Sequence, residues 1–395
     1  MSLPLVGVRI VSVEQYGAGP FGSMLLADLG AEVIKIENPS EGGDVGRAVG
    51  PHFFAAGDSQ FFHAYNRNKK SVTLDLKHAA AKPVLRRLVQ SADATLDNLR
   101  GDQAERLGLT YNELKDCNPN IVCAHLSAYG REGPRKSWPG YDYLMQAEAG
   151  YLSLTGEPDG PPARFGLSVV DQMTGLYAAF ALLAGVVAAR AGGEGRDIDV
   201  SLFDAALQNL TYLAVWYLNG GVNQGRGPRS AHPSLTPSQL YRTRDGFIFI
   251  MCNKEKFWPV LCDSIGRPDW RDQPEYRDFK ARLAHRGRLT EALDAVLSER
   301  TTAEWLATFA GKVPAAPVYD VAGALDSAYV RASASVRTAP HPAGDIRLLA
   351  SPVRCPGEET PCRAAPALGA DTDGVLTSLG FAPSELALLR RDGVI

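Results

Sequence analysis

The segment Leu167–Gly175 places one carboxylate, Asp171, at the start of a long apolar run. No residue from Leu176 to Ala189 is charged, and Arg190 follows. A buried helix over this run would hold Asp171 beside the free N–H groups and the positive dipole end of its first turn. Both would keep the carboxylate ionised where water is scarce, which suits a nucleophile or general base. The alternative is that Asp171 only N-caps the helix.

No other motif for covalent or metal chemistry stands out. The sequence has no G-x-S-x-G, no C-x-x-C pair, and no H-x-x-x-H or H-x-x-E-H spacing among its 7 histidines. Its 6 cysteines are sparse for 395 residues, which is typical of a reduced, cytoplasmic protein without disulfides. We therefore expect no metal site.

A literal G-x-G-x-x-G covers Gly17–Gly22, after an expected strand at Val8–Val13. A second expected strand, Val33–Ile36, ends at the acidic Glu37, so the order resembles a dinucleotide-binding unit. Two details weaken that interpretation, because Pro20 interrupts the motif and Glu37 follows sooner than the usual ~20 residues. NAD, another phosphate-bearing ligand, and close packing without a ligand all remain open.

Apolar strands alternate with helical segments through the first half of the chain, which indicates an α/β fold with a mostly parallel sheet. Further strands are expected at Val72–Leu76, Ala94–Asn98, Ile121–Ser127 and Asp197–Ser201, and helices at Ala79–Ser91, Gly140–Gly150 and Phe203–Leu218. The basic loop Asn66–Ser71 is either a solvated turn or a phosphate-binding edge.

The composition changes at 220–237, which is rich in Gly and Pro and holds Arg226, Arg229 and His232. We interpret this stretch as a linker between a large domain, 1–219, and a smaller α+β domain, 238–324. Residues 325–395 would form a further linker and return to the large domain.

The overall charge and hydropathy favour an ordinary globular protein. Net charge is −3, with 22% charged and 45% hydrophobic residues, so no basic nucleic-acid footprint is present. The N-terminus lacks the basic and apolar regions of a signal peptide. The uncharged run Gly175–Ala189 falls short of the ~20 residues of a membrane span, so we expect neither a membrane nor a nucleic-acid partner.

Six stretches, taken in order, resemble the family III CoA-transferases of the formyl-CoA transferase and carnitine CoA-transferase type. They are Pro4–Glu37, Asn66–Lys77, Asp97–Leu109, Pro139–Pro162, Val169–Ala179 and Ala365–Asp373. The resemblance implies a Rossmann-like large domain built from both chain ends, a smaller middle domain, and an interlocked homodimer. It also implies that Gly17–Gly22 serves CoA and close packing rather than NAD.

The same resemblance implies the chemistry. Asp171 matches the family nucleophile, which attacks a donor acyl-CoA and gives a mixed anhydride and free CoA thiolate. The thiolate then forms an aspartyl-CoA thioester, from which CoA passes to an acceptor carboxylic acid. CoA is a substrate in this scheme, and no tightly bound cofactor is needed.

The resemblance also implies CoA-contacting positions, with some departures. The implied contacts are Tyr16, Gly17, Leu74, Asp75, Leu76, Lys77, Asn98, Leu99, Arg100, Arg106, Trp138, Pro139, Gly140 and Tyr141. Asn38 stands where some members have an arginine, Leu99 replaces a common phenylalanine, Arg100-Gly101 lacks the usual Arg-Pro-Gly, and Ala370-Asp371 replaces a common Glu-His. These departures affect phosphate contacts rather than the fold.

The substrates are less well defined by the sequence. Arg226, Arg229 and His232 could bind a second carboxylate, with succinyl-CoA as donor and a C4–C5 dicarboxylate as acceptor, or they could be surface charges on a linker. An α-methylacyl-CoA racemase would carry G-H-D where this chain has Gly140-Tyr141-Asp142. A catalytically inactive CoA-binding paralogue and an NAD oxidoreductase are the remaining alternatives.

Overall fold

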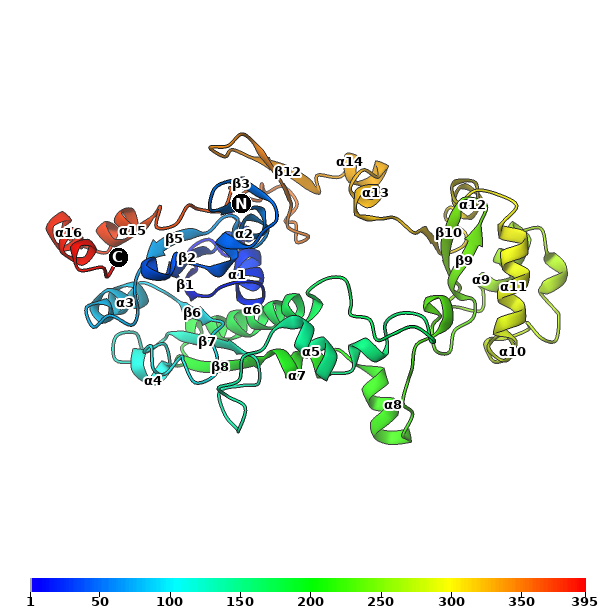
Figure 1. Ribbon diagram of the computed structural model, residues 1–395, viewed down its shortest axis with the longest axis horizontal. Helices are drawn as coiled ribbons and strands as arrows, with labels where there is room; N and C mark the ends of the chain where they lie inside the picture. The colour runs from blue at the N-terminus through cyan, green and yellow to red at the C-terminus, as the bar shows by residue number, and fades with distance from the viewer. Residues whose placement is uncertain (1) are drawn as a thin grey trace. The chain divides into compact units, whose positions relative to one another are not determined.

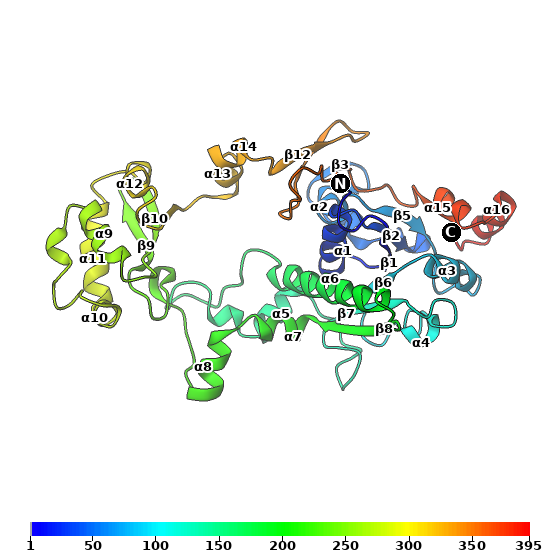
Figure 2. The same ribbon diagram turned by 180° about the vertical axis from the view of Figure 1, so that it is seen from behind.

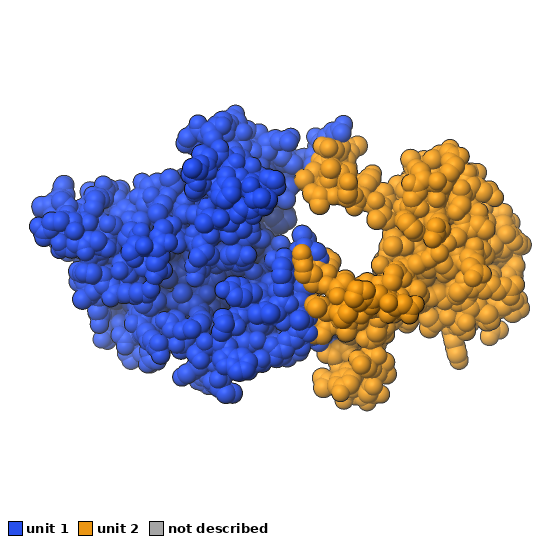
Figure 3. All heavy atoms as spheres, in the orientation of Figure 1, with its two compact units in different colours: residues 1–149, 166–211, 329–395 blue, residues 150–165, 212–328 orange. Residues whose placement is uncertain are grey.

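The computed structural model describes residues 2–395, which form two compact units. Unit 1 contains the chain up to Ala149, Gly166–Thr211 and Tyr329–Ile395, and unit 2 contains Gly150–Phe165 and Tyr212–Ala328 (Figure 3). Both chain ends therefore contribute to unit 1, as Figure 1 also shows.

Unit 1 is built on a six-stranded sheet with the order β5-β2-β1-β6-β7-β8. Its strands are β1 (Arg9–Val13), β2 (Glu32–Glu37), β5 (Lys70–Thr73), β6 (Ala94–Asp97), β7 (Val122–Ser127) and β8 (Arg196–Ser201). Every neighbouring pair is parallel, which confirms the expected α/β class. Chain order runs outward in both directions from β1 and β6, so the boundary between these two strands is the topological switch point of a Rossmann-type sheet.

Two helices, α1 (Ala18–Asp28) and α6 (Val169–Arg190), lie side by side on one face of the sheet (Figure 1, Figure 2). Two glycines permit this approach. A Cβ at Gly22 would overlap the carbonyl oxygen of Gly175, and a Cβ at Gly175 would overlap the carbonyl oxygen of Ala18. The G-x-G-x-x-G motif therefore lies largely inside α1, and its glycines serve helix packing. In a nucleotide-binding loop, by contrast, these glycines would face the phosphate groups of the ligand.

The other face of the sheet is covered by α3 (Ala81–Gln90), α15 (Thr372–Ser378) and α16 (Pro383–Arg391), which share one apolar core with it. In β1, Val11 belongs to this core, as Ile34 and Ile36 do in β2. The C-terminal segment closes the layer, because Val394 and Ile395 are buried in the same cluster. The sheet is thus packed on both faces, as parallel sheets require.

The helix α6 differs from its expected burial and length. It has 22 residues, and an 18-residue window within it has a mean hydropathy of 1.6, so by length and composition alone it could cross a membrane. Asp171 in its first turn and its packing against α1 and β7 identify it as a core helix. Its inner side is buried as predicted, but its outer side is apolar yet exposed, with Leu176 at 50%, Phe180 at 73% and Val187 at 68% exposure.

The helix expected over Phe203–Leu218 is two helices, α7 (Leu202–Gln208) and α8 (Tyr212–Gly220). Thr211 separates them with a left-handed φ of 48°, which an α-helix cannot contain.

Unit 2 holds an antiparallel sheet of β9 (Ser238–Thr243), β10 (Gly246–Met251) and β11 (Ala315–Pro317). Its core includes Trp258, Trp270 and Trp305, supplied by or adjoining the helices α9 (Phe257–Ser264), α10 (Phe279–Ala284), α11 (Arg286–Leu297) and α12 (Thr302–Phe309).

The remaining elements are short. They are β3 (Phe53–Ala55), β4 (Asp58–Ser59), α2 (Gln60–Asn66), α4 (Tyr111–Leu114), α5 (Asp142–Glu148), α13 (Val321–Leu325), α14 (Ala328–Ala332), β12 (Val336–Ala339) and β13 (Ile346–Leu349). Of these, α2 and α5 matter most for the site, because each supplies side chains beside Asp171.

Candidate active site

A first cavity, of about 460 Å³, opens beyond the carboxyl ends of β1 and β6. Strands diverge at a switch point, which is where ligands bind in open α/β sheets. The cavity brings Asp171 together with nine residues expected to contact CoA. These are Tyr16, Gly17, Asn98, Leu99, Arg100, Trp138, Pro139, Gly140 and Tyr141.

Asp171 is the third residue of α6 and is only 7% exposed. Burial, reinforced by the nearby charge of Asp142, raises its pKa to about 7. Desolvation and the second carboxylate thus act against ionisation, in contrast to the expectation that the helix terminus keeps Asp171 ionised. Near neutral pH the side chain is divided between a nucleophilic carboxylate and a protonated acid.

Asp171 does not cap its own helix. The N-cap position belongs to Ser168, whose side chain makes no capping hydrogen bond. The N–H of Asp171 instead donates to Oδ2 of Asp142, at 3.0 Å, from the first residue of α5. Since Asp142 supplies the cap, the carboxylate of Asp171 is left to face the first cavity, which contradicts the capping alternative.

The turn after β1 lies directly on the Asp171 carboxylate. A Cβ at Gly17 would overlap Oδ2 of Asp171, so any larger residue would force the turn or the carboxylate to move. Next to it, Tyr16 adopts a left-handed φ of 69°, which is uncommon for an aromatic residue. Its N–H donates to Oδ1 of Asp44 at 2.9 Å, and its ring packs on Phe61 with centroids 5.1 Å apart. These contacts hold the turn in an otherwise unfavourable conformation.

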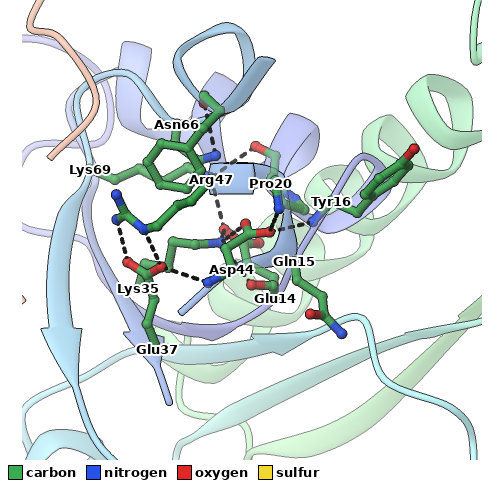
Figure 4. Close-up of polar contacts among 12 residues, drawn as sticks. Glu14, Gln15, Tyr16, Pro20, Lys35, Glu37, Asp44, Arg47, Asn66 and Lys69 are labelled. Atoms are coloured by element: carbon green, nitrogen blue, oxygen red, sulfur yellow. Dashed lines mark hydrogen bonds and ion pairs between the residues drawn. The ribbon is translucent and has the colours of Figure 1, made fainter. Parts of the chain in front are cut away.

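A buried network of ion pairs contacts this turn and stabilises it (Figure 4). Lys35 Nζ pairs with Asp44 at 2.8 Å and donates to the carbonyl oxygen of Glu14 at 2.7 Å. Lys69 Nζ pairs with the Glu14 carboxylate, also at 2.8 Å. Burial lowers the pKa of Lys69 to about 8, against the opposing attraction of Glu14. Two cations and two carboxylates thus neutralise one another without water, as buried charges must.

Asn98, which follows β6, forms hydrogen bonds with the same turn. Its Nδ2 donates to the carbonyl oxygen of Gln15 at 2.7 Å, and its Oδ1 accepts the Gln15 N–H at 2.8 Å. The two loops at the switch point are therefore tied together by a reciprocal pair of hydrogen bonds. This pair fixes the Gln15–Gly17 backbone relative to Asn98.

A second cavity, of about 250 Å³, adjoins the first and shares Gln15, Leu99 and Gln103 with it. Its lining includes all four residues expected at the adenosine end of CoA, Leu74, Asp75, Leu76 and Lys77. Glu37, the acid that a dinucleotide fold would present to a ribose, is also there. Its carboxylate is paired with Arg47 at 2.7 Å and accepts from Ser71 at 2.6 Å, so it is occupied by internal contacts.

A third cavity, of about 340 Å³, shares Leu76, Lys77 and Leu107 with the second. Its charged or titratable lining residues are Lys77, His78, Lys82, Arg86, Glu105, Arg106 and Glu113. Cations outnumber carboxylates here, which favours an anionic group. Arg106 is the predicted phosphate contact, and sequence reasoning missed Lys82 and Arg86, which the amphipathic helix α3 turns toward the same hollow.

The three predicted carboxylate-binding residues all lie in unit 2 and make internal contacts there. Arg226 Nη1 donates to the backbone carbonyls of Glu157, Gly160 and Pro161. Arg229 pairs with Asp294 at 2.5 Å. Nδ1 of His232 accepts from two backbone N–H groups within its own turn. Their proposed role toward a substrate stays a prediction.

One His/His/Asp group in the described part of the chain has ligand atoms close enough for a metal: Asp58, His63 and His341. Nε2 of each histidine lies against the Asp58 carboxylate, at 2.7 Å and 2.9 Å. Nδ1 of each accepts a backbone N–H, from Ala365 and Ala343. A metal-bound histidine would need the opposite tautomer, so this arrangement fits a hydrogen-bonded clasp better than a metal site.

Comparison with known proteins identifies the chain. The family model described as CoA-transferase family III matches residues 5–372. The chain belongs to this family. That result confirms the resemblance of the six sequence stretches and the assignment as a CoA-transferase.

Individual relatives of this CoA-transferase cover most of its length. It is 35% identical to the succinate–glutarate CoA-transferase of Agrobacterium fabrum, over 80% of each chain. It is 31% identical to the succinyl-CoA:mesaconate CoA-transferase of Haloarcula marismortui, over 88% of this chain and 89% of the relative. A CaiB/BaiF family protein from Brucella suis has the same fold, with a TM-score of 0.82 and 30% identity over 96% of this chain and 100% of that one.

The departures from the family pattern have structural roles in this CoA-transferase. Asn38 donates to Asp75 at 3.4 Å within the second cavity. Asp371 accepts the N–H of Ser71 at 2.9 Å and donates its own N–H to the carbonyl oxygen of Ser71, so it extends the edge of the sheet at β5. Arg100 pairs with Asp102 at 3.3 Å beside the first cavity.

Asp142, beside Asp171, is another site residue that sequence reasoning missed. It follows Tyr141 in the Gly140-Tyr141-Asp142 segment, which the sequence analysis used only to argue against a racemase, because the histidine of G-H-D is missing. A carboxylate in the first turn of an expected helix was the available signal, but such residues usually act on their own helix. That Asp142 caps α6 depends on tertiary packing between α5 and α6, which a local pattern does not encode.

Proposed function

We propose that this CoA-transferase moves CoA from succinyl-CoA to a C4–C5 dicarboxylic acid through covalent intermediates on Asp171. The observation that carries the proposal is the position of Asp171, which lies buried under Gly17 in the first cavity. A dry, oriented carboxylate suits an exchange in which water would hydrolyse the intermediate.

The exchange balances without an oxidant or a metal. The Asp171 carboxylate attacks the thioester carbonyl of succinyl-CoA, a C–O bond forms, the C–S bond breaks, and CoA leaves as thiolate. The thiolate attacks the Asp171 carbonyl of the anhydride, which gives the aspartyl-CoA thioester and releases succinate. The acceptor carboxylate then attacks this thioester, and the returning thiolate forms the new acyl-CoA and regenerates Asp171.

Three adjoining cavities support an extended ligand such as CoA. The first contains Asp171, where the thioester would react, and the second contains Leu74–Lys77, where adenosine would lie. The third carries Lys82, Arg86 and Arg106, which could pair with a CoA phosphate. CoA needs an end-to-end path of this kind, because it must stay bound while the acyl group changes.

The choice of substrates rests on the relatives. Those from Agrobacterium fabrum and Haloarcula marismortui are named for succinate, glutarate or mesaconate, which are all C4–C5 dicarboxylic acids. A second carboxylate on the acceptor would need a cation, and Arg226, Arg229 or His232 is our proposal for it. Asp171 supplies the chemistry in either direction of transfer.

A homodimer, interlocked as in the family resemblance, is part of the proposal, as is a cytoplasmic location. The exposed apolar side of α6, with Phe180 and Val187, supports a partner surface. A second copy of the chain would remove this surface from water. Light scattering on the purified protein measures the assembly directly.

The test of function is CoA transfer followed by mass spectrometry. Succinyl-CoA is offered with glutarate, mesaconate and monocarboxylic acids, and Asp171→Asn is the control. We expect new dicarboxyl-CoA from the wild type and none from the variant. Transfer to monocarboxylic acids alone would contradict the substrate assignment. Epimerisation of a 2-methylacyl-CoA offered on its own, without any CoA transfer in the main assay, would indicate a racemase.

A further inference from the structure

A second buried carboxylate, Asp142, stands beside the nucleophile and is unusually well constrained. It is 4% exposed. Its Oδ2 accepts the Asp171 N–H at 3.0 Å, and its Oδ1 accepts from Gln146 Nε2 at 2.6 Å. Gln146 Nε2 also donates to the carbonyl oxygen of Leu167 at 3.1 Å, just before α6. Asp142 therefore connects α5 to the first turn of α6.

Two carboxylates in one dry site repel each other. The pKa of Asp171 is raised by burial and then by the charge of Asp142. Tyr65 on α2 reports the same proximity, because its pKa is raised by burial, by Asp171, by the phenol of Tyr16, by Asp142 and then by Tyr143. Of the charged groups in the described part of the chain, Asp142 is the one whose charge raises the pKa of Asp171. An ionised Asp171 therefore faces a like charge.

Acylation removes that repulsion. In both the anhydride and the aspartyl-CoA thioester, the Asp171 side chain is neutral, so its like-charge interaction with Asp142 is gone. An interaction that is unfavourable in the free carboxylate and relieved along the reaction lowers the barrier to attack. The same backbone hydrogen bond fixes the first turn of α6, so it also fixes the direction of the carboxylate.

We propose that Asp142 is a positioning residue for CoA transfer, one that orients Asp171 through its backbone N–H and drives its acylation through like-charge repulsion. This inference rests on the function proposed above. A purely structural cap would need only the hydrogen bond, whereas this role needs the negative charge as well. Charge and hydrogen bond can be separated by substitution.

The test compares Asp142→Asn with the wild type across pH 5.5 to 9. Asparagine keeps an acceptor for the Asp171 N–H but has no charge. We expect the kcat plateau at high pH to fall about tenfold, because the Asp171 carboxylate becomes less basic and acylation no longer relieves a like-charge repulsion. The midpoint of the pH profile should move to lower pH, so the relative activity of the variant rises as pH falls.

Gln146→Met is the matched control, because it removes a hydrogen bond from Asp142 and leaves its charge. We expect any loss in this variant to be the same factor at every pH. A loss in Asp142→Asn that is likewise independent of pH would overturn the proposal. Thermal melts of both variants, with Asp142→Ala alongside, show whether each is folded.

A measurement without turnover separates this proposal from the proposed function. ¹³C-carboxyl NMR of aspartate-labelled protein follows the Asp171 titration, and the signal that disappears in Asp171→Asn assigns it. We expect its midpoint to fall in Asp142→Asn but to stay above the ordinary aspartate value, because burial remains. An unchanged midpoint overturns the proposal. A lowered midpoint in a protein that transfers no CoA would contradict the proposed function and leave the action of Asp142 on Asp171 standing.

Discussion

The α-carbon of Gly17 lies so close to Asp171 that a single added methyl group would overlap the Oδ2 atom of the carboxylate. The turn after β1 thereby covers one side of Asp171 with backbone. Tyr16 is held in a left-handed conformation by Asp44, and Gln15 is held by Asn98, so the cover is rigid. One glycine thus links the switch point of the sheet to the reacting atom.

Gly17→Ala should abolish most of the CoA transfer and leave the protein folded. The methyl group must displace either the turn or the carboxylate, and overpacking of this kind costs about 1–3 kcal/mol. We expect kcat to fall more than tenfold. Gly374→Ala in α15 is the control, because a Cβ there meets nothing within 4 Å. Equal activity of the two variants would contradict the packing of Gly17 on Asp171.

Asp171→Asn should stabilise the protein at high pH. The pKa of Asp171 is raised from 3.8 to about 7 in the folded state, so the folded protein favours the protonated form. The cost of ionising it is absent below about pH 4 and grows to about 4 kcal/mol as pH rises past 7. Asparagine avoids this cost. Urea unfolding at pH 4 and pH 8 checks the prediction, and a gain that is equal at both pH values would contradict it.

His125 should stabilise the protein at neutral pH and less so in alkali. Burial lowers its pKa, but hydrogen bonds to Asp197 and Asp97 outweigh this and raise it to about 9. The stabilisation that protonated His125 gives the folded state is fully present below pH 6.5 and is lost as pH rises through 9. We expect His125→Gln to lower the free energy of unfolding by about 3 kcal/mol at pH 6 and by much less at pH 9.5. Unfolding curves at the two pH values measure the difference.

Arg106→Ala and Lys82→Ala should weaken CoA binding without slowing the chemical step. Both line the third cavity, away from Asp171. Loss of a charge-assisted contact costs about 1.5–3 kcal/mol, so KM for succinyl-CoA should rise tenfold or more while kcat stays near the wild-type value. Dephospho-CoA esters reveal whether the contact is to the 3′-phosphate. If KM is unchanged in both variants, the phosphate lies elsewhere.

The alternation of apolar strand segments with helical segments in the sequence predicted the parallel sheet of unit 1. The expected strands Ile121–Ser127 and Asp197–Ser201 agree with β7 and β8 within one residue. The strand β7 is buried along its whole length and has a mostly apolar sequence, whereas β8 is half-exposed at the sheet edge and alternates charged with apolar residues. The prediction of one helix over Phe203–Leu218 failed at Thr211, since hydropathy does not report a local left-handed residue. The division into units, with Gly150–Phe165 in unit 2, follows from long-range contacts rather than composition.

Several residues of the site were predicted from the sequence, and others that depend on contacts between distant segments were missed. Asp171, Tyr16 and Asn98 all line the first cavity, and the family resemblance had implied a site role for each. Asp142 and Asp44 act through backbone N–H groups of residues far along the chain, so no local spacing marks them. The raised pKa of Asp171 has the same origin, because it arises from burial and from a carboxylate that tertiary packing brings in.

The most direct test of the central claim is to trap the acyl group on Asp171. Wild-type protein is mixed with succinyl-CoA, quenched in hydroxylamine and digested, and the peptide containing Asp171 is examined by mass spectrometry. We predict an aspartyl hydroxamate at Asp171 in the wild type and its absence in Asp171→Asn. CoA transfer that proceeds at full rate with no hydroxamate at Asp171, or with one at another residue, would contradict the role of Asp171 as the nucleophile.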